Sequence, residues 1–111
     1  MADNPTPMWA QTIIDALTSV AGASVSHTER LKSERYIVWQ EDGAKDLSAN
    51  NRHAEKVVTG SADLYTKQEF DPWGDAVGEA FDAYGVAWSL ESVVLEDDTG
   101  LYHWSWDWEA M

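Results

Sequence analysis

The three histidines are the residues of this sequence best suited to general acid–base chemistry. His27, His53 and His103 lie in three separate segments, and none belongs to a recognisable catalytic motif such as Gly-x-Ser-x-Gly. The chain has no cysteine, so a nucleophile would have to be a serine or threonine beside a histidine. No His-Glu-x-x-His, phosphate-loop or EF-hand pattern is present. The sequence therefore predicts no catalytic residues, no enzymatic activity, no cofactor and no metal.

A second candidate for chemistry is the acidic run Glu96-Asp97-Asp98. Clustered carboxylates suit calcium or magnesium, but no further oxygen ligands follow at a fixed spacing. The run leads directly into Thr99-Gly100, a composition typical of turns. A hairpin turn that happens to be acidic explains it better than a cation site.

Four large aromatic residues alternate with smaller or polar residues in the segment 101–109: Tyr102, Trp104, Trp106 and Trp108. Alternation places them on one face of a strand. A base-stacking platform would need interleaved Lys or Arg, whereas the charged residues here are acidic. A sugar platform would need exposed rings. A core face under helices needs fewer assumptions, so we predict that Trp104 and Trp106 are core residues. Trp108, near the open end, is the ring that could meet a partner.

The charge is strongly negative and unevenly distributed. Twenty acidic and seven basic residues give the 111-residue chain a net charge of −13. All the bases fall within residues 30–67, which carry +1, whereas residues 68–111 carry −11. This balance disfavours binding to nucleic acids or anionic membranes, and no apolar run approaches the roughly 20 residues of a membrane span.

The remaining segments predict the elements that must cover the aromatic strand. Helical periodicity follows the cap-and-proline pairs Thr6-Pro7 and Asp71-Pro72. Strand patterns cover residues 35–40, 54–67, 86–95 and 101–109, and residues 23–26 are either a short edge strand or part of a connection. We predict an α+β fold: a four-stranded, mostly antiparallel sheet with two helices packed on one face, in the order helix-strand-strand-helix-strand-strand.

The length predicts a single domain over residues 1–111, with two irregular segments. Residues 1–5 are expected to form a flexible N-terminus. The polar run Glu41–His53 has neither helical nor strand periodicity, and a connection of this length is usually functional or disordered. We expect it to be mobile in the free protein and ordered in an assembly.

Three motifs in this order resemble those of the small tail-terminator and tail-completion proteins of long-tailed bacteriophages: Tyr36-Ile37-Val38-Trp39, Asp63-Leu64-Tyr65-Thr66-Lys67 and Leu101-Tyr102-His103-Trp104-Ser105-Trp106. The resemblance covers nearly the whole chain. The sequence differs from the family in having Arg35 where proline often stands, and tryptophan where the closing strand often has Tyr or Phe.

This resemblance implies a structural virion protein of the tail and neck, assembled in the host cytoplasm. Such a protein forms a homo-oligomeric ring, usually of six subunits, that caps the tail tube and joins it to the head–tail connector proteins. DNA would pass through the ring without specific binding.

The uneven charge suggests how such a ring could be held together. Identical subunits joined head to tail bring two different surfaces into contact, so the middle third of one chain could meet the acidic last third of the next. The candidate interface residues are Asp42, Lys45, Asp46, Arg52 and Trp108. The alternative function is that of an acidic inhibitor that mimics nucleic acid and occupies a DNA-binding enzyme.

Overall fold

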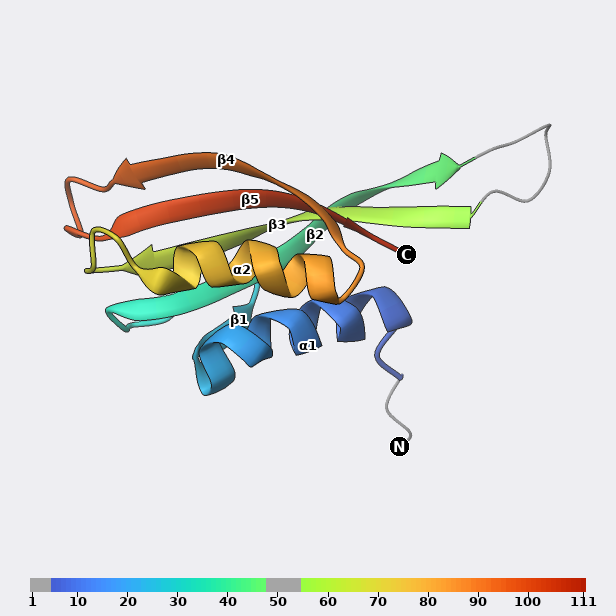
Figure 1. Ribbon diagram of the computed structural model, residues 1–111, viewed down its shortest axis with the longest axis horizontal. Coiled ribbons are helices and arrows are strands. Elements are labelled where there is room, and N and C mark those ends of the chain that lie inside the picture. The colour runs from blue at the N-terminus through green and yellow to red at the C-terminus, as the bar shows by residue number, and fades with distance from the viewer. Residues whose placement is uncertain (1–4, 48–54) are drawn as a thin grey trace.

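The computed structural model describes residues 5–47 and 55–111, which form the predicted α+β fold (Figure 1). Both helices lie on one side of the sheet; we call this side the helix face and the other the open face. In chain order the elements are α1 (Met8–Ala21), a 3-10 turn (Gly22–Ser24), β1 (Val25–His27), β2 (Arg35–Leu47), β3 (Glu55–Thr66), α2 (Pro72–Ala83), β4 (Ala87–Leu95) and β5 (Tyr102–Ala110).

The sheet has one strand more than the sequence predicts. Across residues 5–47 and 55–111 it contains five strands in the order β1-β2-β3-β5-β4. β1 is parallel to β2, and the other neighbours are antiparallel. The predicted four strands and their order are therefore wrong, because the chain runs helix, three strands, helix, two strands. β1 has only three residues, too few for periodicity to separate a strand from a connection.

The predicted polar loop is also wrong over its first half. Residues 41–47 continue β2, which pairs with β3 as far as Leu47 opposite Glu55, with a bulge between Glu41 and Gly43. Residues 41–45 are exposed, so they show no apolar alternation, whereas backbone pairing needs none. The rest of the predicted loop, residues 48–53, and residues 1–4 of the predicted flexible N-terminus lie outside the described residues.

Helix α2 begins as its sequence predicts and is tied to the sheet at that point. The Asp71 carboxylate accepts a hydrogen bond from the Trp73 N–H (2.9 Å) and two from the Arg35 guanidinium (2.8 and 2.6 Å). Burial alone would raise the pKa of Asp71, but these donors hold it below its ordinary value. Arg35 also covers the Trp73 ring, 3.7 Å from its centroid. The same carboxylate therefore caps α2 and attaches it to β2.

The core lies between the helices and the aromatic row of β5. Trp106 and Trp108 are each 1% exposed, and Ile13 and Phe81 are fully buried. Trp104 is partly buried against this cluster, so Trp106 meets the prediction of a core residue fully and Trp104 in part. A side chain at Gly60 would collide with the Trp108 ring, which explains the small residue opposite it.

Candidate interaction surfaces

The two described histidines are held on opposite faces of the sheet. The His27 ring lies 2.7 Å from a Glu41 oxygen and stacks on Trp39, whereas His103 lies 2.7 Å from an Asp63 oxygen on the open face. The hydrogen bond from His27 lowers the pKa of the Glu41 carboxyl. His53 lies outside the described residues. Each described histidine is thus paired with a carboxylate, an arrangement that fixes ring orientation.

The acidic run after β4 forms a hairpin turn. The Glu96 N–H donates to the Leu101 carbonyl, and the Gly100 N–H donates to the Glu96 carbonyl, both at 2.9 Å. The Glu96 side chain accepts hydrogen bonds from Thr99 (2.8 Å) and Arg30 (3.1 Å). In the part of the chain that the structure describes, no group of three or more His, Asp or Glu is placed to hold a metal ion. This geometry matches the turn interpretation of the run.

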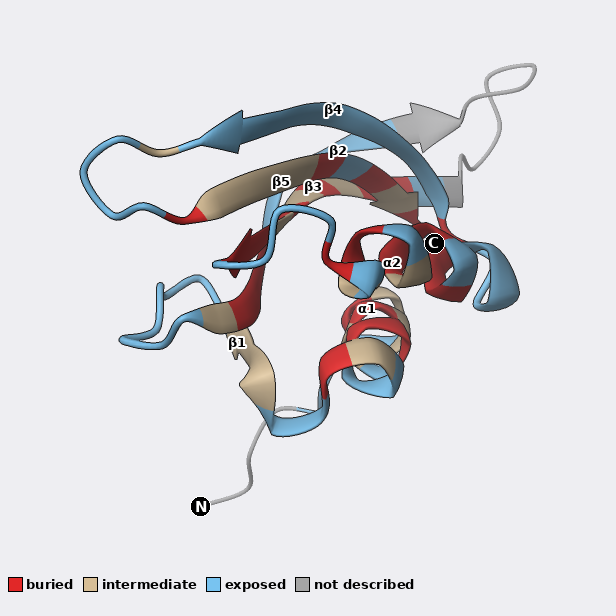
Figure 2. Ribbon diagram, turned by 60° about the vertical axis from the view of Figure 1, so that its left-hand side comes forward, coloured by how far each residue is buried: buried red, intermediate tan, exposed pale blue. Residues whose placement is uncertain are grey.

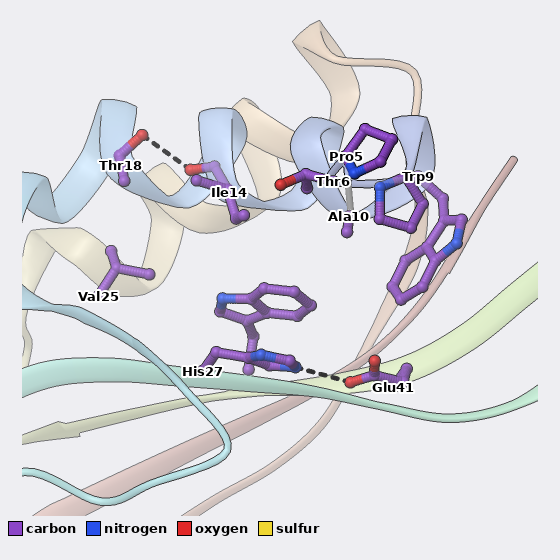
Figure 3. Close-up of a pocket in the computed structure, with 11 residues that line it drawn as sticks. Pro5, Thr6, Trp9, Ala10, Ile14, Thr18, Val25, His27 and Glu41 are labelled. Atoms are coloured by element: carbon purple, nitrogen blue, oxygen red, sulfur yellow. Dashed lines mark hydrogen bonds and ion pairs between the residues drawn. The ribbon is translucent and has the colours of Figure 1, made fainter. Parts of the chain in front are cut away.

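A pocket of about 550 Å³ lies between α1 and the outer strands β1 and β2 (Figure 3). Its wall on the helix side carries Trp9 and Ile14, and its floor carries the His27–Glu41 pair. Trp39 of β2 also lines the pocket, and the His27 ring stacks on it. The complete lining is Pro5, Thr6, Pro7, Trp9, Ala10, Ile14, Thr18, Val25, His27, Trp39 and Glu41. Most of these side chains are apolar, so the pocket suits an apolar side chain better than a charged ligand.

Strand β4 forms one edge of the sheet, and all nine of its residues are exposed (Figure 2). Its large apolar side chains range from 38% exposed at Trp88 to 53% at Val94. Natural proteins usually protect an open edge with a short strand, lysine, proline or a bulge. β4 has no Lys, Arg or Pro, and it departs from regular pairing once, between Leu90 and Ser92. It is therefore a long apolar edge with little protection.

The five predicted interface residues occupy different environments. Asp42 accepts a hydrogen bond from Thr59 (2.7 Å), and Lys45 pairs with Glu109 of its own chain (3.2 Å). Asp46 lies near the end of β2, and Arg52 lies outside the described residues. Trp108 is buried, and its Nε1–H donates to the Ser61 carbonyl (2.8 Å). Because its ring lies in the core, Trp108 offers no surface to a partner.

The open face carries carboxylates that repel one another. Asp107 is exposed, but desolvation by its neighbours raises the pKa of its carboxyl, and so do a hydrogen bond with Glu91 and the nearby charges of Glu91, Asp42 and Asp63. These four acids come from four different strands. Pairing between those strands, which the sequence does not reveal, brings their charges together.

The sequence predicts neither the pocket nor the open edge. β4 has an alternating pattern typical of a half-buried strand, and it lacks the Lys, Arg and Pro that are common on exposed edge strands. Its sequence therefore carries no signal of its edge position. The pocket depends on the spacing between α1 and the short β1, for which the sequence has no signal. None of the described helices has the length and apolar character that a membrane crossing requires.

The fold and surfaces define a small α+β domain with an aromatic core and an open apolar sheet edge. No protein-family model matches the sequence, and no curated protein matches it. Among solved structures, a chain from the virion of a native gene transfer agent particle is similar to this chain. The match has a TM-score of 0.51 and 12% sequence identity, and it covers 88% of this chain and 89% of that chain. At this identity, the likeness establishes a shared fold.

Proposed function

We propose that this protein is a structural virion subunit without enzymatic activity. Specifically, it would be a tail-terminator or tail-completion subunit that forms a ring, caps the tail tube and joins it to the head connector. The observation that carries the proposal is the fold shared with a chain of a virion particle over nearly the full length of both chains. The sequence motifs, which resemble the tail-terminator and tail-completion family, add the position in the tail and neck.

The exposed surface supports assembly rather than an isolated monomer. A nine-residue apolar edge is a liability in a soluble monomer, because its unpaired N–H and C=O groups can pair with another chain. In an assembly the same edge is covered. In a ring, the exposed β4 edge would form a contact with a neighbouring subunit.

The open face supports passage of DNA without retention. In a ring whose helices face outward, this face lines the channel and presents Asp63, Glu91 and Asp107 to the DNA. Protein–DNA affinity comes largely from neutralisation of phosphates by Lys and Arg. A wall rich in carboxylates therefore lets the backbone pass without binding it.

The last part of β2 is the proposed site of contact between neighbouring subunits. Asp42, Lys45 and Asp46 lie in the last part of β2, and the Lys45 side chain is 61% exposed. Arg52 follows them in the sequence, outside the described residues. We expect the double reversal Lys45→Glu with Arg52→Glu to reduce the number of rings seen by electron microscopy. Reversal of Lys32 and Lys67 to Glu is the matched control, because it makes the same charge change elsewhere. Normal rings from the first variant would show that apolar contacts dominate.

The direct test of the proposed function is the mass of the purified protein, alone and with the tail-tube protein of the same virus. Light scattering and electron microscopy should show closed rings that bind one end of the tube. A protein that stays monomeric under both conditions would refute the proposal. A monomer that inhibits a DNA-binding enzyme would instead support the alternative of a nucleic-acid mimic.

A further inference from the structure

The sheet has two open edges of different kinds. One is β4, which pairs only with β5 among the described residues. The other is the outer side of β2 beyond Trp39, because β1 covers β2 only at Ile37–Trp39. From Gln40 to Lys45, β2 pairs with β3 on its inner side alone among the described residues. Each subunit thus carries an open strand at both margins of its sheet.

The strand directions make these two edges compatible. β2 and β5 are each antiparallel to β3, and β4 is antiparallel to β5. β4 therefore runs opposite to β2 within one sheet. If a second copy continues the sheet in the same orientation, its β2 lies antiparallel to the first copy's β4. The joint would be an antiparallel ladder, the geometry already used throughout most of this sheet.

The side chains at the two edges also match. Directly opposite residues of an antiparallel pair share a face, and Leu90 and Val93 lie opposite Trp106 and Trp104 of the aromatic row. Leu90 and Val93 therefore belong to the helix face, together with Leu95. The pocket of Figure 3 opens on the same face, beside Glu41 at the start of the free part of β2. An incoming β4 would present its apolar row to this apolar pocket.

The charges on the open face are compatible with the same joint. Glu91 is the only charged residue of β4, and Lys45 is the only base in the free part of β2, residues 40–45. The two acids in that part of β2 already have partners, since Glu41 pairs with His27 and Asp42 accepts from Thr59. Lys45 is thus available to a neighbouring carboxylate in addition to its own Glu109.

We infer that β4 of one subunit adds to the outer edge of β2, over Gln40–Lys45, of a second copy of this chain. The helix-face row Leu90, Val93 and Leu95 packs against the pocket between α1 and β2 of that copy. This inference rests on the proposed ring and names the contact that builds it. The contact joins two different surfaces, so it is head to tail and can close into a ring.

The absence of cysteine from the chain allows a direct test by cross-linking. Ser92→Cys places a thiol on β4, Gln40→Cys places one on the free edge of β2, and both positions are exposed. Treatment of the double variant with a short bis-maleimide should give a ladder of covalent oligomers that ends at the ring size. Each single variant should remain uncross-linked. The pair Asp98→Cys with Gln40→Cys is the control and should give no ladder.

The outcomes separate this inference from the proposed function. Covalent dimers from Ser92→Cys alone would show that two β4 strands pair with each other, which overturns the inference. Rings that are visible by electron microscopy but give no ladder from the double variant would also overturn it, while the proposed function would stand. A protein that forms no rings at all would refute the proposed function itself.

Discussion

Replacing Leu90 and Val93 of β4 with lysine should weaken the association of subunits without unfolding them. Leu90 and Val93 are 44% and 46% exposed, so about half of each side chain remains to be buried by a partner. Full burial of a leucine or valine contributes about 1.5–3 kcal/mol, which leaves about 1 kcal/mol for each residue at each contact. The variant Leu90→Lys with Val93→Lys should therefore lose about 2 kcal/mol per contact, or roughly 30-fold in affinity.

The assay for this variant is sedimentation over a range of protein concentrations, together with thermal unfolding. Ring formation should move to higher concentration, whereas the melting temperature of the monomer should change little, because surface substitutions usually alter stability by less than about 0.5 kcal/mol. The double variant Ser33→Lys with Gln68→Lys is the matched control, since it adds the same charge at exposed positions. Rings from the β4 variant at wild-type concentration would refute the reasoning. If the lysines destabilise the fold, Leu90→Ser with Val93→Thr should give the same shift in assembly.

Three further variants test the interior and the charges of the subunit. Trp106→Ala should lower stability by about 3–5 kcal/mol, and a melting curve like that of the wild type would contradict its place in the core. The lowered pKa of Asp71 contributes stability that is lost as pH falls through that pKa. Asp71→Asn should therefore lower the free energy of unfolding by about 2 kcal/mol at pH 7 and reduce the loss of stability in acid. If stability fell in acid as steeply as in the wild type, the Asp71–Arg35 pair would be excluded as its cause. Because the pKa of Asp107 is raised, its charge opposes folding above that pKa. Asp107→Asn should therefore raise the melting temperature at pH 7 in low salt, and this gain should decrease as salt is added. A lower melting temperature for the variant would show that the charge is favourable.

The sequence predicts the elements whose own residues determine them. Helix α2 begins at the expected cap because Asp71 and Pro72 act locally, within the first turn. The aromatic row of β5 could be assigned to one face because strand geometry alone fixes the alternation. In both cases the signal and its structural consequence lie within a few residues of each other.

The features that escaped prediction depend on pairing between distant segments. β1 is a strand because Val25 lies beside Ile37, and residues 41–47 are a strand because β3 lies beside them. The proposed interaction surfaces follow the same rule. The pocket needs α1 and β1 at a particular separation, and the exposure of β4 depends on its being last in the sheet, a position that its alternating pattern does not reveal.

The shortness of β1 has a consequence for the shape of any ring built by the proposed joint. Through the strand pairings, β4 lies level with Arg35–Gly43 of its own sheet, but the free edge of a neighbour's β2 begins only at Gln40. Each joint must therefore shift the next sheet by several residues along the strand direction. Such a shift, repeated around a closed ring, is equivalent to the shear of a β-barrel. The strands would then tilt by roughly 35–45° from the ring axis. The acidic rows of the open face would then follow a helical path around the channel.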